Sequence, residues 1–132
     1  ADLAAGAKLI IRERLLTHGD QHAESGFVVN LNGEDSSANV ISRSVAKNNS
    51  TQVFNAEING NTKCAGHSEC DAIIMDHAKI SAIPKIVAND IDAALIHEAA
   101  IGKIAGEQLI KLMTLGLTEQ EAEAQIVNGF LK

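Results

Sequence analysis

The stretch Leu95–Gly102, which reads LIHEAAIG, is where the hydrophobic pattern of the chain changes. Before it, short apolar runs alternate with Asn, Asp and Gly, and after it apolar residues recur three and four positions apart, as in a helix. Counting by twos places one set of residues on one face of an extended segment: Ile91, Ala93, Leu95 and His97. Glu98 then points to the opposite face. The pattern predicts a β-rich region over residues 1–98 and a helical region over residues 99–132.

The β-rich region contains seven short apolar runs separated by turn residues. They cover residues 7–16, 26–32, 39–46, 52–58, 71–76, 80–88 and 91–98. Short strands with little helical pattern between them fit a sandwich, a barrel or a parallel solenoid. Isolated Asn, Asp and Gly suit the left-handed corners of a solenoid, although no strict repeat is evident from the sequence.

The helical region predicts a hairpin of two helices. The first begins near Ala105, and Gly116 is suited to the left-handed position after its last turn. Thr118 and Glu121 have the spacing of a capping box, which starts a second helix at Glu119. The apolar stripe of that helix is Ala122, Ile126, Val127 and Phe130. The stripe must pack on an apolar surface, either the β-rich region or another chain.

The composition limits the functions that this chain can have. The 132 residues are 45% hydrophobic with no Trp or Tyr, which suffices for one domain with an aliphatic core. A net charge of -6 argues against nucleic acid as a partner. No apolar run reaches the length of about 18 residues that a membrane span needs, so we expect no membrane partner and a cytoplasmic protein. The first residue is not Met, which suggests a processed chain or a piece of a longer one.

Two groups of residues are candidates for chemistry. Cys64, His67 and Cys70 have a spacing that could bind zinc or iron with His77 as a fourth ligand, but the usual closed zinc pattern has two CxxC-like pairs, and two buried reduced thiols are the favoured interpretation. His97 lies at the inner edge of an apolar face, so it is either hydrogen-bonded to the backbone or a functional imidazole. No phosphate-binding loop and no hydrolase elbow motif is present.

Several motifs together resemble the SufB/SufD family of iron–sulfur cluster assembly scaffolds. They are Asn55–Ile58 (NAEI), Cys70–Ile74 (CDAII), Ile83–Ile86 (IPKI), Ile96–Gly102 (IHEAAIG), Glu107–Leu109 (EQL) and Gly116–Ala122 (GLTEQEA). The resemblance runs from about Phe54 to Lys132 and corresponds to the C-terminal portion of a family member. It implies a right-handed parallel β-helix, or solenoid, followed by a C-terminal α-helical hairpin.

The resemblance also implies a function. The chain would be a scaffold rather than an enzyme, with a SufC-like ABC ATPase bound to the hairpin. It would form a dimer with itself or with a SufB/SufD-like paralogue, and would carry a transient iron–sulfur cluster. The predicted partner-binding residues are Leu109, Leu112, Met113, Ile126, Val127 and Phe130. The predicted iron or cluster ligands are His97, Glu98, Cys70 and Cys64. The sulfur-handling cysteine of the SufB branch falls at Ala78 or Lys79 here, so that group is missing.

Two other classes of function remain open at this stage. A β-helix enzyme acting on carbohydrate would usually present aromatic platforms, and the absence of Trp and Tyr counts against it. A purely structural solenoid that oligomerises through an exposed edge is the other.

Overall fold

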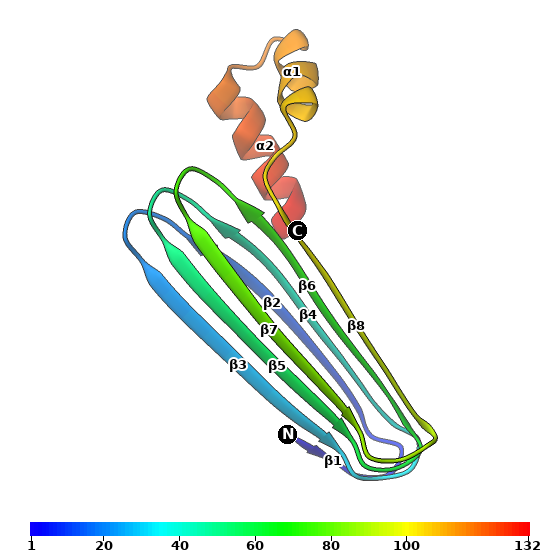
Figure 1. Ribbon diagram of the computed structural model, residues 1–132. Helices are drawn as coiled ribbons and strands as arrows, with labels where there is room; N and C mark the ends of the chain where they lie inside the picture. Colours follow the sequence, from blue (N-terminus) through cyan, green and yellow to red (C-terminus); the bar gives the residue numbers. More distant parts are fainter.

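The computed structural model of residues 1–132 is a stack of parallel β coils with two helices at one end (Figure 1). The strands are β1 (Asp2–Leu3), β2 (Lys8–Thr17), β3 (His22–Leu31), β4 (Ser36–Ala46), β5 (Thr51–Gly60), β6 (Cys64–Ile74), β7 (Lys79–Ala88) and β8 (Ala93–Gly102). Successive strands alternate between two four-stranded sheets: sheet A, in the order β1-β3-β5-β7, and sheet B, in the order β2-β4-β6-β8. All pairings are parallel, which confirms the predicted parallel β-helix.

Each coil is 28 or 29 residues long, and this is the repeat that the sequence does not make evident. Equivalent corners of three successive coils are occupied by Gly19, Asn48 and Asp76, all with φ between 57° and 58°. The side chain of one corner accepts a hydrogen bond from the backbone N–H of the previous one. Gly19 N–H donates to Asn48 Oδ1 across 29 residues, and Asn48 N–H donates to Asp76 Oδ2 across 28, each at 2.9 Å. Three residue types thus fill the same left-handed position.

The core lies between the two sheets and is built from the inward-facing alternate residues of each strand. Leu31, Ile58 and Val40 are at most 1% exposed. Gly66 on β6 leaves space for these large side chains, because a Cβ there would lie 2.7 Å from Leu95 Cδ2 and 2.9 Å from Ile58 Cγ2. Small inward residues on sheet B therefore accommodate large aliphatic ones.

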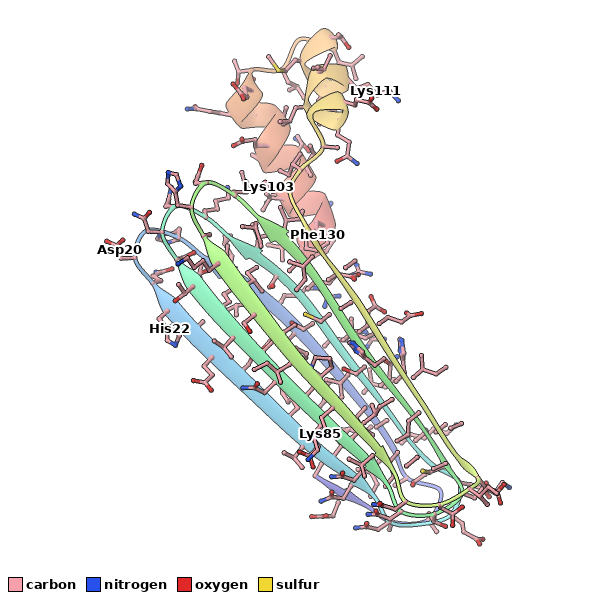
Figure 2. All side chains as sticks on the ribbon, in the orientation of Figure 1. Asp20, His22, Lys85, Lys103, Lys111 and Phe130 are labelled. Carbon is pink, nitrogen blue, oxygen red and sulfur yellow. The ribbon has the colours of Figure 1, made fainter.

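The helices are α1 (Gly106–Thr114) and α2 (Glu119–Leu131), which form the predicted hairpin. Gly116 has φ 95°, and the Thr118–Glu121 capping box is present, as expected. Val127 of α2 is buried against Val45 and Met75 at the carboxyl ends of β4 and β6. Figure 2 shows Phe130 at this junction. The α2 stripe therefore packs on the β-helix of the same chain.

The structure differs from the prediction in three places. Residues 64–70 were not expected to form a strand, but they are the first part of β6. Ile91 was expected on the inner face, yet it is 98% exposed in the corner before β8. Strand β8 continues to Gly102, four residues beyond the predicted boundary at residue 98. Neither helix is long and apolar enough to cross a membrane.

Candidate functional site

The inner faces of β6 and β8 place His97 next to Ser68. The two residues are partners in the parallel register, in an inward column that continues to Val40 and Ile11. Both His97 Nδ1 and Ser68 Oγ are buried and have no hydrogen-bond partner. The interpretation of His97 as a backbone-bonded histidine is therefore wrong for this nitrogen. An imidazole with a buried, unoccupied ring nitrogen can still accept a ligand or a proton.

Cys70 is the nearest inward thiol to this pair. It follows Ser68 by two positions on β6, so it lies on the same face, one step farther along the strand. Burial, with smaller contributions from the negative charges of Asp71 and Glu13, raises the pKa of the Cys70 thiol to about 11. Only about one Cys70 side chain in 10⁴ is a thiolate at pH 7, and the thiolate is the form that binds metals. A metal at Cys70 must therefore displace the thiol proton.

The two cysteines cannot act on one ion. Both are buried and free, and they lie on the same face of β6, six positions apart. At about 3.3 Å per residue, their Cα atoms are about 20 Å apart, whereas a disulfide requires less than about 7 Å. His67 has the opposite parity and lies on the outer face, while His77 is exposed in the next corner. The metal site that the Cys64, His67, Cys70 and His77 spacing suggested is therefore wrong.

Glu98 lies on the outer face of sheet B, away from His97. Its Oε2 atom is 3.3 Å from Nε2 of His67. Glu69 is the register partner of Glu98, and the ligand atoms of His67, Glu69 and Glu98 all lie within 4.8 Å of one another. His97 and Glu98, which are neighbours in the sequence, therefore lie on opposite faces of sheet B. Glu98 lies beside His67 and Glu69, which the sequence does not group with it. Only the pairing of β6 with β8 reveals this group, although the His-x-Glu alternation of residues 67 and 69 was visible.

The positions equivalent to the missing SufB-branch cysteine are at the corner between β6 and β7. Ala78 is buried there, and Lys79 is the exposed first residue of β7. Neither side chain can accept sulfur, so this corner contributes no thiol to the site.

The predicted partner-binding residues have different surroundings. Val127 is buried, and Ile126 and Phe130 are partly buried, so α2 is the anchored helix. Helix α1 has no buried residue, and the predicted Met113 is 43% exposed. Leu109 and Leu112 are partly buried on the same helix. Two further apolar side chains, which the sequence analysis did not select, are more exposed: Ile110 at 62% and Leu115 at 80%.

Comparison with known proteins identifies the family. The family model described as the SufBD core domain of SUF system FeS cluster assembly matches residues 3–130. The chain belongs to the SufBD family. The predicted family is confirmed, and the SufBD match extends much farther toward the N-terminus than the motifs from Phe54 onward.

Three SufBD relatives define the extent of the similarity. An iron–sulfur cluster assembly SufBD family protein of Methanothermobacter thermautotrophicus is 35% identical over 127 residues, which are 95% of this chain and 31% of that protein. The protein with the same description from Methanocaldococcus jannaschii is 40% identical over 105 residues, covering 79% of this chain and 33% of the relative. The Mycobacterium bovis protein is 32% identical over 117 residues, which are 86% of this chain and 14% of that protein. The chain spans one third or less of these SufBD relatives.

Proposed function

We propose that this chain is a non-enzymatic scaffold for iron–sulfur cluster assembly in the cytoplasm, and that its C-terminal hairpin binds a SufC-like ABC ATPase. The observation that supports this proposal is the exposure of three large apolar side chains in α1 and directly after it: Ile110, Met113 and Leu115. A group of exposed large apolar residues is typical of a protein-binding surface. Family membership supports the role in cluster assembly.

The two helices have separate roles in this proposal. Helix α2 anchors the hairpin, because Val127 is buried against Val45 and Met75 of the β-helix. Helix α1 presents its apolar side chains to the ATPase, since none of its residues is buried in this chain. A movement of the ATPase would reach the β-helix through α2, at the carboxyl ends of β4 and β6.

The last coil is the proposed pairing surface for a second copy or a SufB/SufD-like chain. Strands β7 and β8 are the final strands of sheets A and B, so each has one edge without a neighbouring strand. Unpaired backbone groups on such an edge can pair with another chain. A two-fold arrangement would bring His97 near its equivalent in the second chain, where a transient cluster would form as cargo. The residues Cys70 and His97 are the inner-face candidates for contact with that cargo.

The ATPase proposal is tested by changing α1 alone. The double variant Ile110→Asp/Leu115→Asp should weaken binding of the ABC ATPase at least tenfold, measured by calorimetry, with unchanged far-UV circular dichroism. Val28→Asp is the matched control, because Val28 is similarly exposed at 53% but lies on β3 of sheet A. Unchanged binding by the double variant, or equal loss with Val28→Asp, would contradict this role and leave a structural oligomerising solenoid as the better proposal.

A further inference from the structure

We infer that the outer face of sheet B carries a site for a divalent first-row transition-metal ion, such as Fe²⁺, Zn²⁺ or Co²⁺, formed by His67, Glu69 and Glu98. The inference goes beyond the proposed function, because it requires neither an ATPase nor the inner-face residues His97 and Cys70. It rests on the positions of three side chains and on the hydrogen bond that orients one of them.

The backbone brings the three ligands together. His67 and Glu69 alternate along β6, so both point outward, and Glu98 on β8 is in register with Glu69. All three side chains project from paired strands rather than from loops. Their ligand atoms lie within 4.8 Å of one another. Metal bonds of about 2.0–2.2 Å place opposite ligands up to about 4.3 Å apart, so small rotations of the glutamate side chains would close the site.

A neighbouring amide orients the imidazole for metal binding. His67 Nδ1 is 3.0 Å from Asn39 Oδ1, an atom that can only accept a hydrogen bond, so Nδ1 carries the proton. The other ring nitrogen, Nε2, then directs its lone pair toward Glu98 Oε2 at 3.3 Å. A cation bound by both atoms, whether a proton or a metal ion, would relieve the repulsion between this lone pair and the carboxylate. The hydrogen bond from the second ring nitrogen is also the usual support for a metal-bound histidine.

The types of ligand in the group favour a divalent first-row transition-metal ion. Glu69 also has the Arg43 guanidinium nearby, whose Nη2 atom is 3.9 Å from Glu69 Oε1. One imidazole nitrogen with two carboxylates suits borderline ions, whereas Ca²⁺ takes six to eight oxygen ligands and Cu⁺ prefers sulfur. The Glu98 side chain is 65% exposed and that of His67 31%, so water can occupy the remaining positions and the ion can exchange.

Strand β3 contains a matched control for this geometry. His22 and Glu24 have the same His-x-Glu spacing and are both exposed (His22 is labelled in Figure 2). The register partner of Glu24 is Val53, so this pair has no third ligand. A site that depends on three converging side chains should therefore form at His67 and not at His22.

The test is titration of the untagged full chain with Co²⁺, followed by the visible absorption of the bound ion, and anaerobic calorimetry with Fe²⁺. We expect one equivalent to bind, and His67→Ala and Glu69→Gln/Glu98→Gln each to weaken binding at least tenfold. His22→Ala and Glu24→Gln should keep wild-type affinity. Far-UV circular dichroism establishes whether each variant is folded. If His67→Ala does not fold, the variant Glu69→Gln/Glu98→Gln still tests the site. Equal Co²⁺ affinity in the wild-type protein and the folded glutamate variant would overturn the inference, as would loss of binding in His22→Ala alone.

Discussion

Replacing Gly66 by Ala tests whether the close packing between the two sheets is as tight as the structure shows. The added Cβ would lie 2.7 Å from Leu95 Cδ2 and 2.9 Å from Ile58 Cγ2, and ordinary contacts begin near 3.4 Å. Leu95 is partly buried on the last strand of sheet B and can move, but Ile58 is 0% exposed and its Cγ2 is attached directly to Cβ. Overpacking of this kind costs about 1–3 kcal/mol.

The opposing effect comes from the unfolded chain. Replacing Gly by Ala reduces the conformational freedom of the unfolded state and stabilises a protein by about 0.4–1 kcal/mol where the backbone allows it. The net loss for Gly66→Ala is therefore between about 0 and 2.6 kcal/mol. Gly26 on β3 is the control, because a Cβ there meets nothing within 4 Å and its φ is not positive. Gly26→Ala should stabilise the chain by about 0.4–1 kcal/mol.

Urea unfolding followed by circular dichroism measures both variants, and the change in the unfolding midpoint at constant slope gives the stability difference. Adding Leu95→Ala to Gly66→Ala should remove one of the two overlaps, so the two substitutions should not be additive. Equal stabilities for Gly66→Ala and Gly26→Ala would refute the packing argument.

Three further predictions concern titration and docking. The pKa of Cys70 is raised to about 11, so the unfolded chain loses this proton at lower pH than the folded chain, and the free energy of unfolding should fall as pH rises above about 9. Cys70→Ser should remove this contribution to the pH dependence of urea unfolding. Iodoacetamide should modify Cys70 in the native chain much more slowly than a free thiol. Hydrogen bonds from the Thr118 backbone and hydroxyl lower the pKa of Glu121, so the stabilisation of α2 should be present above about pH 4.5 and be lost as pH falls through the lowered value. Glu121→Gln should make α2 protection in hydrogen exchange independent of pH in that range once intrinsic exchange rates are corrected. Val127→Asp places a charge against Val45 and Met75 and should release the hairpin to limited proteolysis while the β strands stay resistant; unfolding of the entire chain would show instead that the hairpin and coils are one cooperative unit.

Much of the fold could be predicted from local patterns. Alternating polarity indicated the β runs, and Thr118 with Glu121 indicated the start of α2. The first half of β6 could not be predicted, because residues 64–70 read CAGHSEC and contain small and polar residues in place of β-branched ones. Gly66 faces the larger Ile58 of the opposite sheet, and that complementarity is a property of the packed structure.

The candidate site was harder to predict from the sequence than the fold, because it depends on the pairing of strands that are far apart in the chain. His97 could be placed on an inner face from its own strand alone. The proximity of Glu98 to His67 depends on the register between β6 and β8, which pairs residues 29 positions apart. The corner residues Gly19, Asn48 and Asp76 mark that period only to a reader who treats them as conformational equivalents. Periodicity within a strand therefore predicts a face, and the coil length decides which side chains meet on it.

The unequal coil lengths have a consequence for insertions and deletions. The corner between β5 and β6 has three residues, 61–63, whereas the corner between β7 and β8 has four, 89–92, yet the strands on either side remain in register. One residue can thus be gained or lost at this end without changing which side chains face inward. The same change within β8 would exchange the faces of His97 and Glu98, since side-chain direction alternates at every position. Length variation among homologous coils should therefore concentrate in these corners. Strands β6 and β8, which carry candidate metal-binding residues on both faces, should be invariant in length.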